Sequence, residues 1–123
     1  ARLGGECRAF INNGAFAVGI DLNPGENNKY VMVGDFHALQ FADHSIDIAY
    51  TNCIDHAFDI SKMMAETQRV LKPGGLFIAE IMRGLQDEQN WKPDDYDCAF
   101  WDKTDDIIKV IAEKLGGAAV THR

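Results

Sequence analysis

Three polar side chains stand where short apolar runs end, and their recurrence indicates a ligand site. They are Asp21, Asp35 and Asn52. If the runs are neighbouring parallel strands, their carboxyl ends meet at one edge of a sheet, where open α/β sheets bind ligands. Carboxylate and amide oxygens there accept hydrogen bonds from hydroxyl or amino groups. A single strand-end aspartate is more often a loop cap, so the prediction of a site depends on the ordered set.

The stretch Gly34–Ile81 contains the elements that would position these side chains. Asp47–Thr51 is a short run bounded by polar residues, which is typical of a buried strand. Apolar residues then recur at helical spacing, namely Ile60, Met63, Met64, Val70 and Leu71. Lys72–Gly75, with the sequence Lys-Pro-Gly-Gly, ends that predicted helix, because proline lacks the helical N–H and glycine tolerates the turn. Leu76–Met82 is the next strand, and the order strand, helix, strand predicts a βαβ unit in a parallel sheet.

Regular elements are also predicted upstream of this unit. A helix is expected at about Glu6–Asn13, and Gly14 would end it. Strands are expected at Phe16–Ile20 and at Tyr30–Val33, each followed by turn-forming residues.

Downstream, the pattern predicts one more helix. Thr104 is the expected N-cap, and Asp105 and Asp106 place negative charge in the first turn, where it complements the helix dipole. Gly116 is the expected end of this helix. Ala118–Thr121 is interpreted as the beginning of a last strand.

The totals suit one small domain with a core, since the chain has 123 residues and a hydrophobic fraction of 46%. A net charge of −7 argues against a broad surface for nucleic acid or anionic membrane. The cysteines Cys7, Cys53 and Cys98 are odd in number and lack Cys-x-x-Cys spacing. We therefore predict neither a disulfide scaffold nor a structural zinc site, and we expect a reducing compartment, the cytoplasm. No apolar run approaches transmembrane length.

Four segments carry a family resemblance by their order and spacing. They are Val18–Pro24, Gly34–Phe41, Ser45–Asn52 and Glu66–Leu76. Together they resemble a class I S-adenosylmethionine-dependent methyltransferase, of the type often called methyltransferase type 11. The resemblance implies an α/β fold with a doubly wound, mostly parallel sheet and helices on both faces. It also implies S-adenosyl-L-methionine as cofactor and transfer of its methyl group to an unidentified acceptor.

The resemblance assigns roles to the polar strand ends. Asp21 would accept hydrogen bonds from both ribose hydroxyls, since a carboxylate offers two oxygens to two neighbouring donors. Asp35 would take the adenine amino group, and Asn52 would lie near the methionine part of the cofactor. Three neighbours would border the adenosine: Leu22, Asn23 and Phe36.

The start of the chain departs from the family pattern. The family's first strand ends in a glycine-rich turn that faces the methionine part of the cofactor, and only Ala1–Gly5 is left to match that turn. Through this match Arg2 and Gly4 are assigned to the cofactor site, although Arg2 stands where the pattern has a small residue. The family's first and seventh strands are not evident. We therefore interpret residues 1–123 as a single methyltransferase-like domain, trimmed at both ends.

His56 is the candidate catalytic base. Methyl transfer from a sulfonium is an in-line displacement, in which the enzyme mainly aligns donor and acceptor and sometimes deprotonates the nucleophile. Asp55 or Asp59 would orient the imidazole. The alternative is a histidine that caps a helix or supports other residues, because many methyltransferases need no dedicated base. A metal site made of these three side chains is not predicted, and His37 and His44 are interpreted as loop residues.

The segment Arg83–Asp102 gathers aromatic residues among acids. They are Trp91, Tyr96, Phe100 and Trp101. In the family, inserts at this place often shape the acceptor pocket, so these side chains could form a lid, and aromatics beside acids could hold a cationic substrate. The alternative is that the segment simply packs on the sheet.

Two other functions are alternatives to methyl transfer. A nicotinamide-dependent Rossmann domain also uses an acid after its second strand, but it requires a G-x-G-x-x-G turn that residues 1–6 do not supply. A non-catalytic relative that binds an adenosyl ligand, or serves in an assembly, is the alternative from a different class. The expected partner is a small-molecule or unknown acceptor, with no nucleic acid and no membrane. The oligomeric state stays open.

Overall fold

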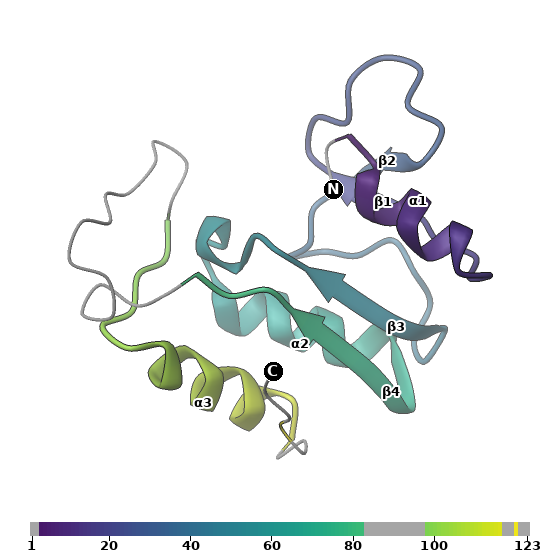
Figure 1. The fold of residues 1–123 in the computed structure, drawn as a ribbon. Helices are drawn as coiled ribbons and strands as arrows, with labels where there is room; N and C mark the ends of the chain where they lie inside the picture. The colour runs from purple at the N-terminus through teal and green to yellow at the C-terminus, as the bar shows by residue number, and fades with distance from the viewer. Residues whose placement is uncertain (1–2, 83–97, 117–119, 121–123) are drawn as a thin grey trace. The chain divides into compact units, whose positions relative to one another are not determined.

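The computed structural model describes residues 3–82, 98–116 and 120. The chain divides into two compact units, residues 1–40 and residues 41–123. In Figure 1 the first unit runs from purple to blue, and the second continues through teal and green to yellow. Each unit contains one pair of parallel strands. The predicted class, α/β with parallel strands, is therefore confirmed.

The first unit consists of α1 (Gly5–Asn12), β1 (Gly19–Asp21) and β2 (Val31–Val33). In the parallel pair Gly19 lies opposite Val31 and Asp21 lies opposite Val33. The helix agrees with the prediction to within one residue at each end. Gly14 follows it with a φ of +87°, a left-handed conformation that glycine adopts without a steric penalty.

β1 is shorter than the predicted strand Phe16–Ile20. Regular pairing begins only at Gly19, and Phe16 is 98% exposed. The cause lies on the facing segment, where the side-chain oxygen of Asn28 accepts hydrogen bonds from the backbone N–H groups of Tyr30 and Val31. A side chain that binds the backbone in this way favours a turn over an extended ladder, so residues before Gly19 have no strand to pair with.

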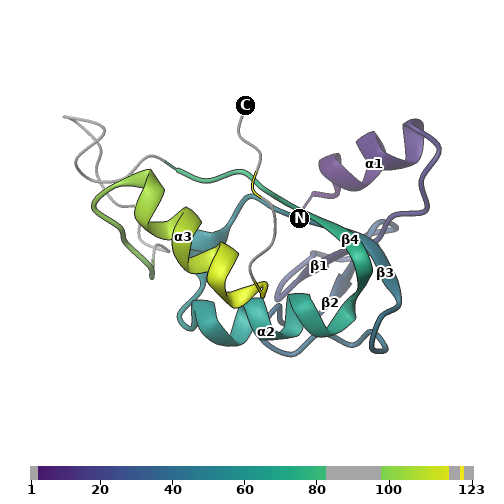
Figure 2. The ribbon, with the colours of Figure 1, turned by 90° about the horizontal axis from the view of Figure 1, so that it is seen from below.

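The second unit has the order β3, η1, α2, β4, α3. The elements are β3 (Ile46–Thr51), the 3-10 helix η1 (Ile54–His56), α2 (Ile60–Val70), β4 (Leu71–Ala79) and α3 (Thr104–Lys114). β3 and β4 are parallel, so the predicted βαβ unit is confirmed. α2 lies along the β3–β4 pair, and α3 contacts α2 (Figures 1 and 2). Among the described residues, the most completely buried large side chains are in this unit: Ile54, Met64 and Val70.

The helix ends just before the Lys-Pro-Gly-Gly segment, as predicted, but the prediction that the next strand begins only at Leu76 is wrong. α2 ends at Val70, and Leu71 already pairs with Ile46 as the first residue of β4. The next regular pair joins Ile48 to Leu76, so residues 72–75 bulge out opposite residue 47. A bulge accommodates a proline, which cannot donate to the ladder, and Gly74 takes a φ of +77° within it.

The prediction for α3 needs one correction and is otherwise confirmed. The helix begins at Thr104, so the N-cap residue is Lys103 and not Thr104. The Asp106 carboxylate reaches back to accept a hydrogen bond from the backbone N–H of Lys103 at 3.3 Å, which satisfies a donor at the helix start. Gly116 follows the helix with a φ of +75°, as expected. Of the predicted strand Ala118–Thr121, all but Val120 lies outside the described residues.

The helices in the described part of the chain are short. The longest, α2 and α3, have 11 residues each. None of the described helices combines the length and the apolar content that crossing a bilayer requires.

Candidate functional site

Asp21 and Asp35 lie at the carboxyl ends of two neighbouring strands in the first unit, Asp21 as the last residue of β1 and Asp35 two residues after β2. The backbone N–H of Gly34 donates to the carbonyl oxygen of Asp21 at 2.9 Å, which extends the β1–β2 pairing up to the residue before Asp35. The structure thus brings these two predicted site residues to the same end of one parallel pair. This is the arrangement that places ligand groups at strand ends in α/β proteins.

Asp21 has a local structural partner. Its Oδ1 accepts a hydrogen bond from the backbone N–H of Asn23 at 2.9 Å, which closes a small turn after β1. The predicted neighbours Leu22 and Asn23 are both exposed, Leu22 to 71%. The exposed Leu22 side chain beside the half-buried Asp21 carboxylate suits contact with a ligand that has both a ring and hydroxyl groups.

Gly34 is required for its close contacts. A Cβ atom at this position would lie 2.8 Å from the Ile20 side chain and would overlap the side-chain oxygen of Gln40. The Gln40 side-chain amide donates to the carbonyl of Val33, the last residue of β2, at 2.9 Å. A larger residue at 34 would push apart the segment that carries Asp35.

Asp35 begins a tight turn that contains Phe36 and His37. The backbone N–H of Ala38 donates to the Asp35 carbonyl at 2.9 Å. The Asp35 Oδ1 accepts from the backbone N–H of His37 and lies 2.8 Å from the His37 Nδ1. The imidazole is only 3% exposed, and its centroid is 4.6 Å from that of the Phe36 ring.

His37 is therefore a residue that the sequence interpretation missed. It lies in a loop, as predicted, but it is also buried against both predicted adenine contacts, which the sequence interpretation did not anticipate. The sequence signal for this contact is the spacing Asp-x-His after a strand. An aspartate that starts a turn accepts a hydrogen bond from the backbone N–H two residues later, and the side chain at that position then lies near its carboxylate.

Gly4 lies at the other end of the strand pair. A Cβ on Gly4 would be 2.9 Å from the Tyr30 Cβ, just before β2 begins, whereas Asp21 and Asp35 lie at the carboxyl ends. Its cofactor role stays a prediction. Arg2 lies outside the described residues.

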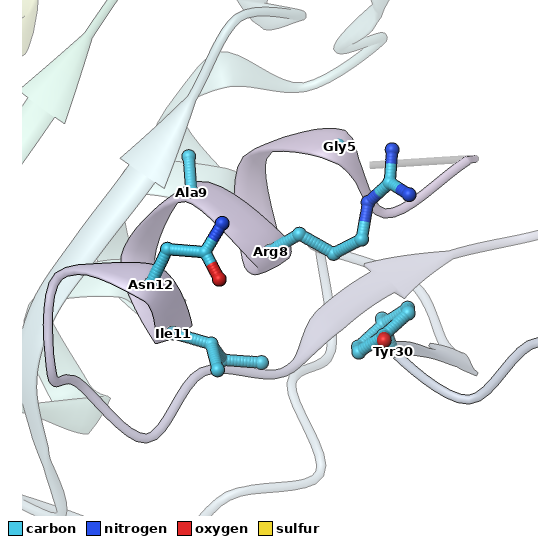
Figure 3. Close-up of a pocket in the computed structure, with 6 residues that line it drawn as sticks. All are labelled: Gly5, Arg8, Ala9, Ile11, Asn12 and Tyr30. Carbon is cyan, nitrogen blue, oxygen red and sulfur yellow. The ribbon is translucent and has the colours of Figure 1, made fainter.

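A pocket of about 340 Å³ lies between α1 and Tyr30. Figure 3 shows its lining, which is formed by Gly5, Arg8, Ala9, Ile11, Asn12 and Tyr30. None of the predicted cofactor residues is among them. The pocket is thus separate from the carboxylates at the strand ends.

In the second unit, Asn52 and His56 lie on the segment after β3. Asn52 is exposed, and Glu80 donates its backbone N–H to the carbonyl of Thr51 just before it. The His56 Nε2 lies 3.3 Å from the Asp55 Oδ2, with the imidazole 46% exposed and the Asp55 side chain 9% exposed. Asp55 is thus placed to orient the imidazole, as one of the two predicted orienting residues.

Asp59 has another role. Its Oδ1 accepts from the backbone N–H of Lys62 at 2.9 Å, so it is the N-cap of α2. Among the described residues, no cluster of three or more His, Cys, Asp or Glu side chains is arranged to hold a metal ion.

The described end of the aromatic segment, residues 98–102, contacts the loop of His56. Cys98 and Ala99 both donate backbone N–H groups to the Asp55 carbonyl at 2.8 Å. The Trp101 indole donates to the carbonyl of Met82 at 3.0 Å, and Phe100 is 51% exposed. Trp91 and Tyr96 lie outside the described residues. The choice between lid and packing therefore stays open for this segment.

Comparison with known proteins identifies the family. The family described as "Methyltransferase domain" matches residues 3–79. The chain belongs to this family. The matched range includes the strand-end residues Asp21, Asp35 and Asn52, and also His37 and His56.

Two curated methyltransferases show the similarity in sequence. Malonyl-(acyl-carrier protein) O-methyltransferase 1 of Coxiella burnetii is 37% identical over an alignment of 68 residues, and the match covers 52% of this chain and 24% of that protein. Sterol 4-C-methyltransferase strm-1 of Caenorhabditis elegans is 32% identical over an alignment of 91 residues, and the match covers 62% of this chain and 27% of that protein. The methyltransferase-domain chain thus spans about a quarter of the length of these relatives.

A solved structure shows the similarity in fold. A chain from the Haloferax volcanii complex of the Trm112 methyltransferase activator with a methyltransferase has a TM-score of 0.71 at 20% identity. The match covers 92% of this chain and 57% of that chain. At this identity the likeness supports the methyltransferase fold and says nothing about partners.

Proposed function

We propose that this protein binds S-adenosyl-L-methionine and transfers its methyl group to an acceptor whose chemical class is not assigned. The observation that carries the proposal is the pair of carboxylates, Asp21 and Asp35, at the carboxyl ends of two hydrogen-bonded parallel strands in a methyltransferase-family chain. We further propose that residues 1–123 form a single methyltransferase-like domain, because the family match at residues 3–79 runs through both units.

The residues at these strand ends fit an adenosine. Ribose presents two neighbouring hydroxyl donors and adenine presents an amino donor, and ionised carboxylates only accept hydrogen bonds. Asp21 would take the ribose and Asp35 the amino group. Leu22 and Phe36 add apolar surface for the ring, and the Asp35 side chain is 38% exposed. The bound sulfonium supplies an activated methyl group, while the residues of this chain bind and orient the donor.

Asn52 and His56 are proposed for later steps of the same function. Asn52 would contact the methionine part of the cofactor. His56, with Asp55 beside it at 3.3 Å, would accept a proton from an oxygen or nitrogen nucleophile. Arg2 and Gly4 are proposed as further cofactor contacts on the basis of the family motif alone.

The acceptor class is open within this proposal. The two curated relatives are named for an O-methyl and a C-methyl transfer to different kinds of compound, so family membership leaves the acceptor undetermined. The net charge of −7 favours an acceptor other than nucleic acid. The odd number of cysteines and their lack of Cys-x-x-Cys spacing support the proposal of a cytoplasmic location. Burial raises the pKa of the Cys7 thiol, and the charge of Glu6 raises it further, which is unfavourable for a nucleophile.

The proposal is tested by comparing two adenine-containing ligands. S-adenosylhomocysteine and NAD⁺ both contain an adenosine, but only the first has the methionine-derived part. We expect saturable binding of S-adenosylhomocysteine and much weaker binding of NAD⁺, measured by isothermal titration calorimetry. Preferential binding of NAD⁺ would replace the methyltransferase proposal with the nicotinamide-dependent alternative.

A further inference from the structure

One buried imidazole contacts both residues that the proposed site assigns to adenine. We propose that His37 is a positioning residue that makes the site selective for the exocyclic amino group of adenine. This inference rests on the proposed function, because it concerns how that site distinguishes its ligand. It concerns a residue that neither the family match nor any relative's name identifies.

The hydrogen bonds of His37 hold the Asp35 carboxylate in one orientation. The backbone N–H and the Nδ1 of His37 both lie 2.8 Å from the same oxygen, Oδ1. Because an ionised carboxylate only accepts, Nδ1 must carry the hydrogen in this contact. A carboxylate has acceptor capacity for about four donors, and 38% of the Asp35 side chain is exposed, so an amino group can approach it from solvent.

Burial makes His37 an effective support. Its side chain is 3% exposed, whereas that of Asp35 is 38% exposed. The imidazole also packs against the Phe36 ring, with centroids 4.6 Å apart and an interplanar angle of 40°. A single fixed side chain thus restrains both the polar and the aromatic contact proposed for adenine, and such preorganisation lowers the ordering cost of binding.

Selectivity follows from the chemistry of the base. The amino group of adenine donates to a carboxylate. In hypoxanthine a carbonyl replaces this amino group, and a carbonyl only accepts hydrogen bonds. The carbonyl and the Asp35 carboxylate would then face each other without a hydrogen between them, and neither would be satisfied. A carboxylate that is held in place enforces this mismatch. A carboxylate that can rotate away relieves it, and discrimination falls.

The test compares S-adenosylhomocysteine with its deaminated analogue, S-inosylhomocysteine. For the wild-type protein we expect the dissociation constant of the analogue to be roughly tenfold higher or more, as for the loss of a hydrogen bond to a charged group. His37→Phe keeps an aromatic ring beside Phe36 and removes the donor, and it should bring the two dissociation constants to within about threefold. His37→Asn keeps a donor at about the position of Nδ1 and should retain most of the discrimination.

The controls separate positioning from simple packing. A purely structural role would weaken both ligands equally in His37→Phe and leave their ratio unchanged, which would overturn the assignment. His44→Asn alters a histidine of the second unit, whose Nδ1 contacts the Leu71 carbonyl, and it should leave the ratio unchanged. Far-UV circular dichroism checks the fold of every variant.

Two further outcomes are decisive. If the wild-type protein binds S-adenosylhomocysteine but does not discriminate against the analogue, the His37 assignment fails while the proposed function stands. If it binds neither ligand, both fail together. Should His37→Phe not fold, the imidazole ¹⁵N chemical shifts of the wild-type protein give an independent readout. The proposal expects a protonated Nδ1, and a neutral ring protonated only at Nε2 would overturn it.

Discussion

His56 is an exposed residue of η1 that lies beside a buried carboxylate, and its proposed role can be tested separately from cofactor binding. If it is the base, His56→Ala should lower kcat by roughly 100-fold, the lower end of what a general base contributes. The affinity for S-adenosylhomocysteine should change little, because the imidazole is proposed to contact the acceptor. Kinetics with an acceptor that the protein methylates, together with calorimetry, would check both.

The matched control for this prediction is His44→Ala. His44 is a second exposed histidine of the same unit, and its Nδ1 contacts a backbone carbonyl, not a carboxylate. We expect this variant to keep its turnover. Equal activity of His56→Ala and the wild-type protein would show that His56 has only a supporting role in the loop.

At the residue scale, the sequence predicts the polar residues at the strand ends better than the residues that hold them in place. Asp21 and Asp35 stand out because apolar runs end directly before them. His37 does not stand out, since its importance depends on burial and on the Asp35 side chain that turns back toward it. Burial of a turn residue is a result of tertiary packing, and no local pattern reports it.

At the scale of elements, the bulge in β4 places two adjacent glycines in different conditions. Gly74 has a φ of +77° and open space around it, so Gly74→Ala should cost about 1 kcal/mol of stability through backbone strain alone. Gly75→Ala should cost more, because its Cβ would lie 2.8 Å from the Lys72 carbonyl oxygen. Urea denaturation would measure both free energies of unfolding.

Gly5→Ala is the control for this pair. Gly5 is in α1, and a Cβ there would meet nothing within 4 Å. We expect an effect between zero and a stabilisation of about 1 kcal/mol, since alanine loses less entropy than glycine on folding. A Gly75→Ala protein as stable as Gly5→Ala would contradict the tight contact at the bulge.

The helices and strands differ in how well the sequence predicts them. α1 and α2 agree closely with the prediction, because helical periodicity is a local property. The strand boundaries depend on a partner. β1 begins three residues late because Asn28 holds the facing backbone in a turn, and β4 begins at Leu71 because Ile46 pairs with it. Pro73, Gly74 and Gly75 indicate an irregular backbone in the sequence, but they do not indicate that β4 continues on both sides of it.

At the scale of the whole molecule, the two units share one design. Each pairs two parallel strands and places polar residues after their carboxyl ends. The family match runs through both units, which supports the proposal of one methyltransferase-like domain. The chain spans about a quarter of the length of its curated relatives, so the acceptor and any partner are questions for binding and activity measurements.

Asp21 connects the fold to this proposal, because its carboxylate both closes the turn to Asn23 and would bind the ribose. Asp21→Ala removes both functions. Asp21→Asn keeps a neutral acceptor for the Asn23 N–H and loses only the charge. A graded loss of cofactor affinity is therefore expected across the wild-type protein, Asp21→Asn and Asp21→Ala.

The most direct test is calorimetric titration of S-adenosylhomocysteine into the wild-type protein and these two variants. The account predicts one saturable site in the wild-type protein and a loss of roughly 1.5–3 kcal/mol of binding free energy in Asp21→Ala, as expected when a charged hydrogen-bond acceptor is removed. Asp21→Asn should fall between the two. A folded wild-type protein that shows no saturable binding, or an Asp21→Ala variant with undiminished affinity, would contradict the proposed site.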